Sequence, residues 1–295
     1  MNSCLNRPPV ERAQPRLGTL VSLRVEGLQE ATAHRAIDAA FAEIATVHQR
    51  MSFHHPQSDV SRLNRSALHG PVEVHPWTFA VIEYAHHCSQ ASQGCFDISV
   101  GAALVKSGAL PAPAHAPALQ NGSWRDIELL PDSCVVFHRP LWIDLGGIAK
   151  GFAVDRAAER LAEFGPIRAV VNAGGDLRVL GSEAERIRLG APSSDCVAPI
   201  LELADGSAAG SSSMAADARH DASPAGAHLD AMLRRPAPTG RFACVVAEHC
   251  MTADALTKVV IAQGKASDSV LRQFGATAWM KDWNSDWRRL GAEIA

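Results

Sequence analysis

The chain has 295 residues, of which 47% are hydrophobic and 20% are charged, and its formal net charge is −3 at pH 7. A chain of this length can bury a large core in one domain or in two closely packed ones. The slightly acidic balance argues against a nucleic-acid-binding surface, and no apolar run approaches the length of a membrane-spanning helix, so we expect neither a nucleic-acid partner nor membrane insertion.

The first predicted elements follow a polar N-terminal segment. Residues 1–15 contain no apolar stretch of the kind found in secretory signals, so we expect a flexible N-terminus and a cytoplasmic protein. Hydrophobic residues then alternate over 19–25, which predicts a β-strand, and recur at helical spacing over 31–50, which predicts an amphipathic helix. A second helix is predicted to begin at Pro76, because proline is favoured in the first helical turn, and to end near Gly94.

The middle of the chain predicts a loop followed by a crossover unit. A proline- and alanine-rich segment near 108–118 is typical of an exposed connection between subregions. The apolar residues 141–143 resemble a strand, a helix is predicted over 149–164, and 167–172 is predicted to be a buried strand. Together these three elements would form a strand-helix-strand crossover.

The last part of the chain predicts a long loop, a strand and a helix. Residues 204–227 are rich in alanine, serine, glycine and aspartate with little periodicity, which predicts a poorly ordered loop. A strand is predicted over 242–247, and a helix over 251–264 that ends at a glycine. The periodicity as a whole favours a mixture of α and β structure.

The sequence IDLGGIAKG at 143–151 places an acid, two glycines and a lysine at the start of a predicted helix. Adjacent glycines permit positive φ angles and let a ligand approach the backbone, and the first turn of a helix offers unpaired N–H donors to an anion. Lys150 adds a positive charge, and Asp144 can accept a hydrogen bond or hold a metal. The pattern is neither the Walker loop nor the dinucleotide GxGxxG pattern. The residues alone leave open an anion site or a tight turn with a surface lysine.

Several glycine- or acid-bearing motifs follow one another in a specific order. They are LGT (17–19), MSFHHPQSDVSRLN (51–64), GCFD (94–97), DLGGIAKG (144–151), NAGGD (172–176), AHLD (227–230) and ADALTK (253–258). In this order they resemble the motifs of the FAD:protein FMN transferase family, also called ApbE-like flavin transferases. The resemblance extends over about residues 16–280.

This resemblance implies an α+β fold with two lobes, in which mixed β-sheets are flanked by helices and FAD binds in a cleft between the lobes. It implies a single flavin transferase domain over 16–285, followed by a C-terminal tail over 286–295. It also implies that the protein transfers FMN from FAD to a threonine hydroxyl of an acceptor protein, releases AMP and uses Mg²⁺ at the pyrophosphate. Members of the family often work in the periplasm or on a membrane anchor.

The resemblance also assigns site residues. The residues expected to bind FAD are Leu17, Phe53, Cys95, Phe96, Asp97, Asp144, Lys150 and Leu229. The expected Mg²⁺ ligands are the backbone carbonyl of Gly147 and the side chains of Asp254 and Thr257, because Mg²⁺ prefers oxygen ligands. His228, or an acid at the metal such as Asp254, is expected to act as the catalytic base for the acceptor threonine.

One departure from the family pattern concerns the metal. The family has an acid and a threonine four residues later, whereas here Asp254 is followed at that interval by Lys258, and Thr257 comes one residue early. Thr257 lies on roughly the same helical face as Asp254 and can still reach an ion. A Lys258 ammonium that points inward would instead repel the ion. An ordinary Asp254–Lys258 ion pair on the helix surface is the third alternative.

A second departure lies in the segment 227–240, which lacks the family's D-P-x-T-G sequence and contains Arg234 and Arg235. These arginines either supply positive charge at the phosphates or are solvated. The sequence GSS at 210–212 stands where the family has T-S-G. Three functions therefore remain open: transfer of FMN to a protein, hydrolysis of FAD to FMN and AMP, and a non-catalytic role in FAD binding or assembly.

Overall fold

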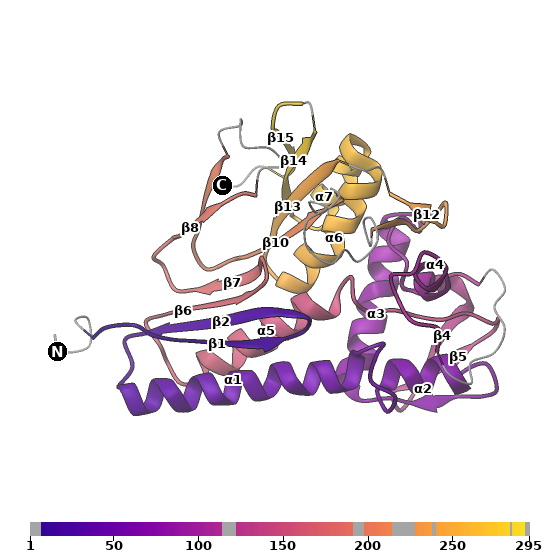
Figure 1. Cartoon of the computed structure of the whole chain (residues 1–295), viewed down its shortest axis with the longest axis horizontal. Helices are drawn as coiled ribbons and strands as arrows, with labels where there is room; N and C mark the ends of the chain where they lie inside the picture. The colour runs from indigo at the N-terminus through magenta and orange to yellow at the C-terminus, as the bar shows by residue number, and fades with distance from the viewer. Residues whose placement is uncertain are drawn as a thin grey trace.

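An eight-stranded antiparallel sheet organises the larger part of the molecule (Figure 1). The structure, a computed structural model, describes residues 7–113, 122–190, 198–213, 228–237, 240–283 and 285–292. In spatial order the strands are β1 (Val10–Arg16), β2 (Thr19–Glu26), β6 (Arg168–Ala173), β7 (Asp176–Leu180), β10 (Ser207–Ser212), β13 (Arg241–Ala247), β14 (Thr277–Asp282) and β15 (Arg288–Gly291). Every neighbouring pair in this order is antiparallel.

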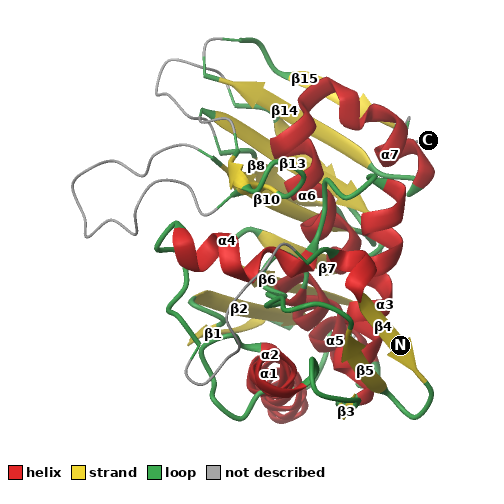
Figure 2. Cartoon of the chain, turned by 90° about the vertical axis from the view of Figure 1, so that its right-hand side faces the viewer, coloured by secondary structure: helices red, strands yellow, loops and turns green. Residues whose placement is uncertain are grey.

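Three long helices bury their apolar stripes against this sheet and one another. α5 (Ala149–Ala162) packs on β6 and β7, α6 (Cys250–Gln263) packs on β10 and β13, and α1 (Glu30–Met51) packs against α5. Figure 2 shows α6 and the short α7 (Asp268–Gln273) on one side of the strands. The buried stripe of α1 has the helical spacing that the sequence predicts: Ala33, Ile37, Ala40, Ile44 and Val47.

A smaller region lies beside the sheet, at the lower right of Figure 1. It contains α2 (Asp59–Ser66), α3 (Pro76–Ala91), α4 (Gly101–Lys106) and a three-stranded sheet of β3 (Val72–Glu73), β5 (Cys134–Phe137) and β4 (Ile127–Leu130), in that order. The remaining described elements are the hairpins β8 (Glu185–Arg188) with β9 (Ile200–Leu203) and β11 (Leu229–Asp230) with β12 (Arg235–Pro236), and the 3₁₀ turns η1 (Ile98–Val100), η2 (Trp124–Asp126) and η3 (Gly264–Ser267).

The hydrophobic core is shared between the large sheet and the smaller region. One continuous cluster includes Val21 of β2, Ile82 of α3 and Leu256 of α6, all almost fully buried. Ile143, in the loop before α5, belongs to the same cluster. A second, smaller cluster lies between β7 and the β8–β9 hairpin and includes Val179. No helix among the described residues is long and apolar enough to cross a membrane.

Most of the predicted elements are confirmed, and the fold class is α+β as expected. The helices predicted over 31–50, from Pro76, over 149–164 and over 251–264 correspond to α1, α3, α5 and α6, and the strands predicted over 19–25, 167–172 and 242–247 correspond to β2, β6 and β13. The sheets differ from the expected mixed sheets, because every strand pairing among the described residues is antiparallel.

The predicted strand over 141–143 is wrong, because a side chain takes the place of a neighbouring strand. The amide of Asn64 on α2 exchanges two hydrogen bonds with the backbone of Ile143: Oδ1 accepts from the N–H at 2.8 Å, and Nδ2 donates to the carbonyl at 3.0 Å. The predicted strand-helix-strand crossover is therefore also wrong. β6 instead pairs antiparallel with β2 and β7.

The predicted loop over 204–227 is wrong for residues 207–212, which form β10 in the middle of the large sheet. These residues are alanine, glycine and serine, which are weak strand formers on their own. β10 is packed against α6, and short side chains allow the helix to approach the sheet closely. Residues 214–227 of the predicted loop lie outside the described residues, as do 114–118 of the loop predicted near 108–118.

Both ends of the chain contribute a strand to the large sheet. Residues 10–15, assigned to a flexible N-terminus, belong to β1, and residues 288–291, assigned to a C-terminal tail, form β15. The β1–β2 hairpin turns at Leu17 and Gly18, whose φ angles are 53° and 72°. Positive φ at both turn residues matches the twist of the flanking strands, so the turn allows β1 to pair with β2. β1 is largely polar, and hydrophobic alternation therefore does not predict it.

Candidate functional site

Two cavities meet at the loop that precedes α5. The first, of about 390 Å³, is lined by residues 95–98, by β10, by the β11 region and by Lys258. The second, of about 320 Å³, lies between the β1–β2 turn and the C-terminal end of α1. The two cavities share four lining residues: Leu110, Asp144, Gly146 and Lys150. A ligand with two bulky parts joined by a polar bridge fits such an arrangement.

The structure brings most of the expected site residues to these two cavities. Cys95, Phe96, Asp97, Gly147, His228 and Leu229 line the first cavity, Leu17 and Phe53 line the second, and Asp144 and Lys150 line both. Asp254 and Thr257 line neither cavity, because both are fully buried in α6. Lys258, one helical turn after Asp254, reaches the first cavity in their place.

The shared wall of the two cavities is the glycine-containing turn before α5. Gly146 donates its N–H to Oδ2 of Asp144 at 3.1 Å. Burial raises the pKa of Asp144 to about 6, while the hydrogen bond from Gly146 and the charges of His54 and Lys258 act in the opposite direction. α5 begins without a side-chain cap at Ile148. Two N–H groups of the first turn already have acceptors, since Ala149 donates to the Leu145 carbonyl at 2.8 Å and Gly151 donates to Asp254 Oδ2 at 3.0 Å, so the wall depends on Lys150 for its positive charge.

Lys150 and Asp176 form an ion pair beside this wall. Nζ of Lys150 lies 2.8 Å from Oδ2 of Asp176, whose side chain is only 1% exposed. Oδ1 of Asp176 has no hydrogen-bond donor among the described residues. Burial disfavours the charged form of Lys150, but the nearby charges of Asp176 and Asp254 outweigh burial and raise its pKa. Lys150 therefore remains positively charged at the edge of both cavities.

The side-chain oxygens of Asp254 and Thr257 are all hydrogen-bonded to protein groups. Asp254 Oδ2 accepts the N–H of Gly151 at 3.0 Å, and Oδ1 pairs with the ammonium of Lys258, which also donates to the Asp254 carbonyl at 3.1 Å. The Thr257 hydroxyl donates to the Asp254 carbonyl at 2.7 Å and bonds the Ser211 hydroxyl at 2.8 Å. Within the described part of the chain, no three acidic, histidine or cysteine side chains are grouped to hold a metal.

Among the alternatives for Lys258, the ion pair with Asp254 is the one present, but it is not a surface pair. The side chain of Asp254 is 0% exposed and that of Lys258 is 22% exposed. The stem of Lys258 lies beside Gly147, since a Cβ at that glycine would be 3.5 Å from Lys258 Cε. The ammonium thus lies between Asp254 and the segment whose carbonyl was expected to bind Mg²⁺.

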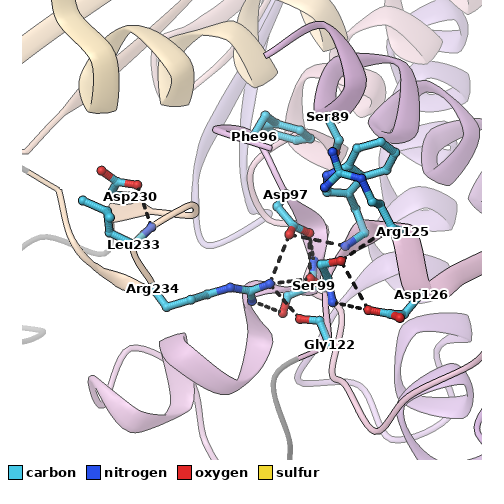
Figure 3. A network of polar contacts seen from close by, with 12 residues as sticks. Ser89, Phe96, Asp97, Ser99, Gly122, Arg125, Asp126, Asp230, Leu233 and Arg234 are labelled. Atoms are coloured by element: carbon cyan, nitrogen blue, oxygen red, sulfur yellow. Dashed lines mark hydrogen bonds and ion pairs between the residues drawn. The ribbon is translucent and has the colours of Figure 1, made fainter. Parts of the chain in front are cut away.

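Arg234 fastens the β11–β12 hairpin to the wall of the first cavity (Figure 3). Its guanidinium donates to Asp97 Oδ2 at 3.1 Å, to the Ser99 hydroxyl at 2.9 Å, to the Ser99 carbonyl at 2.5 Å and to the Gly122 carbonyl at 2.8 Å. Arg234 lines neither cavity, and although its side chain is 31% exposed, its guanidinium is held by protein acceptors rather than free in solvent. Arg235 is exposed, as solvation predicts.

The same network occupies Asp97. Its Oδ1 accepts the N–H of Ser99 at 2.7 Å and the Ser99 hydroxyl at 2.7 Å, and its Oδ2 accepts the N–H of Trp124 at 3.3 Å besides the guanidinium of Arg234. Asp97 therefore lines the first cavity beside Cys95 and Phe96, with both of its carboxylate oxygens already hydrogen-bonded to the protein.

His228 precedes β11 and lines the first cavity. Burial, together with the charges of Lys258 and Lys150, lowers the pKa of His228 to about 4. The charge of Asp254 and a hydrogen bond with the Ser212 backbone act in the opposite direction. The imidazole is therefore neutral at pH 7 and can accept a proton.

Sequence reasoning missed several residues of the site. Asp176 lies in the quoted NAGGD motif, but nothing in the sequence indicates that it pairs with Lys150. Arg234 was noticed only as a charge, because its partners Asp97 and Ser99 lie more than 130 residues away. Leu110, which lines both cavities, comes from the proline- and alanine-rich segment and carries no motif.

Comparisons with known proteins concern the sequence and the fold of the chain as a whole. The sequence matches the ApbE family over residues 17–279. Two similar curated proteins are named FAD:protein FMN transferase. That of Treponema pallidum is 28% identical over 64% of this chain and 57% of its own length. That of Vibrio cholerae is 26% identical over 87% of this chain and 82% of its own length. The match to the Treponema pallidum protein thus spans little more than half of that relative.

Solved structures show the same fold. The ApbE protein of Thermotoga maritima superposes with a TM-score of 0.82 at 25% identity, covering 96% of this chain and 97% of that one. The flavin transferase ApbE of Vibrio cholerae superposes with a TM-score of 0.80 at 22% identity, covering 97% of this chain and 98% of that one. The expected ApbE-like fold is therefore confirmed.

Proposed function

The chain belongs to the ApbE family, and on this basis we propose that it is a flavin transferase that moves FMN from FAD to a threonine hydroxyl of an acceptor protein and releases AMP. The single observation that carries the proposal is the pair of cavities that share Asp144, Gly146 and Lys150. FAD consists of a flavin half and an adenosine half joined by a pyrophosphate. Cavities of about 390 and 320 Å³ offer a place for each half.

The pyrophosphate would lie at the wall that the two cavities share. There the charged Lys150 favours negative oxygens. The walls on either side are largely apolar, with Phe96 and Leu229 in the first cavity and Leu17 and Phe53 in the second. Such walls suit flat aromatic groups, while the charged groups fix the bridge between them.

The resemblance also implies Mg²⁺, which would act as a Lewis acid at the pyrophosphate. The residues of this chain do not fit that ion. Both carboxylate oxygens of Asp254 already have partners, Lys258 and the N–H of Gly151. The Thr257 hydroxyl is bonded to Ser211 and to the Asp254 carbonyl. Because Mg²⁺ requires near-octahedral oxygen ligands, we assign no step to it.

The proposed reaction exchanges one bond at phosphorus for another. The acceptor oxygen attacks the phosphorus on the flavin side, and the bond from that phosphorus to the bridging oxygen breaks. AMP leaves with the bridging oxygen and its electron pair, and the acceptor keeps FMN through a phosphoester bond. The hydroxyl proton passes to a ring nitrogen of His228, which is neutral at pH 7. Lys150 offsets the negative charge on the phosphate oxygens.

The experiment that tests the function measures the intact mass of an acceptor. The protein is mixed with FAD and an acceptor domain that carries an accessible threonine, and AMP is quantified in the same sample. A mass gain equal to FMN with an equal amount of AMP supports transfer, and an acceptor with that threonine changed to valine is the control. Release of FMN and AMP without an adduct indicates hydrolysis. Bound but intact FAD indicates a binding protein.

A further inference from the structure

Lys258 carries one positive charge at the place where the family pattern would put a divalent cation. We propose that the Lys258 ammonium takes over the role of that cation, so that this protein binds and cleaves its pyrophosphate substrate without a divalent metal. The identity of the substrate rests on the proposed function. The exclusion of a metal rests only on the contacts around Asp254.

The first argument is the occupancy of the expected ligands. The ammonium of Lys258 pairs with Asp254 Oδ1 and donates to the Asp254 carbonyl at 3.1 Å. The other oxygen of Asp254 accepts from Gly151 at 3.0 Å. A metal at this position would have to displace an ammonium held in place by a fully buried carboxylate. The displaced ammonium, whose side chain is only 22% exposed, would then lie close to a dication of like charge.

The second argument is charge balance. Two carboxylates, Asp176 and Asp254, are buried here, and burial together with the charge of Asp254 raises the pKa of Asp176 to about 6. They are paired with two ammonium groups, Lys150 at 2.8 Å from Asp176 and Lys258 on Asp254. The cluster of four residues is therefore already neutral. In a site that used a dication here, two carboxylates would instead balance the metal, and the second lysine would be redundant.

The third argument is the direction in which Lys258 can act. An ammonium has three N–H donors, and the described contacts of Lys258 both go to Asp254. The side chain lines the first cavity and is 22% exposed, next to Gly147 at the shared wall. A donor thus remains for a phosphate oxygen in the cavity. A positive charge preorganised by Asp254 stabilises developing negative charge without moving.

The decisive experiment compares the wild-type protein with Lys258→Thr, with and without divalent ions. After EDTA treatment, and with the threonine-bearing acceptor domain present, the wild-type protein should release AMP from FAD at a rate within about twofold of its rate in Mg²⁺. Lys258→Thr should lose about 100-fold in EDTA, the usual effect of removing one electrostatic donor, and should recover at least tenfold in Mg²⁺. Lys265→Thr, a change at an exposed lysine beyond the end of α6, is the matched control and should behave as the wild type. A wild-type activity that EDTA abolishes and Mg²⁺ restores overturns the proposal.

A binding measurement decides the inference even if no turnover is found. Mn²⁺ is titrated into each FAD-loaded protein, and free Mn²⁺ is followed by electron paramagnetic resonance. Lys258→Thr should bind one Mn²⁺ that the wild type does not bind, and adding Asp254→Asn to that variant should abolish it. Binding of Mn²⁺ to the wild type that Asp254→Asn removes overturns the inference, as does a folded Lys258→Thr that binds none. Absence of both AMP and adduct under all conditions would instead count against the proposed function.

Discussion

The backbone N–H of Gly151 donates to the buried carboxylate of Asp254 at 3.0 Å, so α5 and α6 touch directly beneath the shared wall of the two cavities. A Cβ at Gly151 would lie 2.3 Å from the Cys250 carbonyl oxygen and 2.8 Å from Asp254 Cβ. The same contact therefore fixes the distance between the helices and the orientation of the acid that holds Lys258.

Gly151→Ala should lower the free energy of unfolding by about 1–3 kcal/mol, because the new methyl group overlaps backbone that cannot move aside. Denaturant unfolding followed by circular dichroism measures the change. The control is Gly210→Ala on β10, where a Cβ would meet its first neighbour at 3.9 Å. Equal stability of both variants would show that α5 and α6 separate easily.

Asp155→Asn should change how stability depends on pH. Asp155 accepts the N–H groups of Cys250 and Met251, both at 2.8 Å, and burial raises its pKa to about 6 from 3.8. Between these values the folded protein binds the proton more tightly than the unfolded chain, so the contribution of this group to stability falls as pH rises. The stability of the wild type relative to Asp155→Asn should fall by about 2 kcal/mol from pH 4 to pH 7, because the unfolded group is already more than half ionised at pH 4. Urea unfolding at several pH values measures this difference, and a constant difference would contradict the raised pKa.

His228→Ala should reduce FMN transfer by about 10²–10⁴-fold while FAD binding is retained, because the variant lacks a base for the acceptor hydroxyl. The wild-type rate should show no inflection near pH 6.5 from this residue, because the pKa of His228 is lowered to about 4. Rates of adduct formation from pH 5 to 8 test both statements. His249→Ala, at an exposed histidine before α6, is the control. Full activity of His228→Ala with normal FAD binding would remove His228 from the mechanism.

Arg234→Gln should raise the Kd for FAD by about tenfold, which corresponds to about 1.4 kcal/mol. The change removes the guanidinium bonds to Asp97, Ser99 and Gly122, so the hairpin that carries Leu229 is no longer held at the cavity. Titration of FAD fluorescence gives the Kd. Arg235→Gln, at the next residue and exposed, should leave the Kd unchanged. Similar effects of the two variants would mean that the Arg234 network does not position the wall.

Periodicity predicted the elements whose side chains pack on a single partner. The stripe of α1 and the alternation of β2 are visible in the sequence because one face of each is buried throughout. It failed where a single side chain or a neighbour at close range decides the structure. Asn64 replaces a strand beside Ile143, and the contact with α6 selects small residues in β10. Neither effect produces a periodic pattern of hydrophobic residues in the sequence.

The motifs predicted which residues reach the cavities better than they predicted what those residues do. Ten of the expected positions line a cavity, but the roles of Asp97, Asp254 and Thr257 depend on partners far away in the sequence. Arg234 and Lys258 each fill hydrogen-bonding positions that a ligand or a metal would otherwise take. These two roles become visible only when the spatial neighbours of each side chain are known, and a single sequence does not specify those neighbours.

The division of the binding space into two cavities that touch only along Asp144, Gly146, Lys150 and Leu110 has a consequence for inhibition. A molecule cut at this boundary leaves one fragment on each side, and neither fragment has to pass the other to depart. AMP and FMN should then be able to occupy the protein at the same time, each as a partial inhibitor of its own half. Because the phosphates of both fragments would lie beside Lys150 at the shared wall, like-charge repulsion should make each fragment weaken the binding of the other.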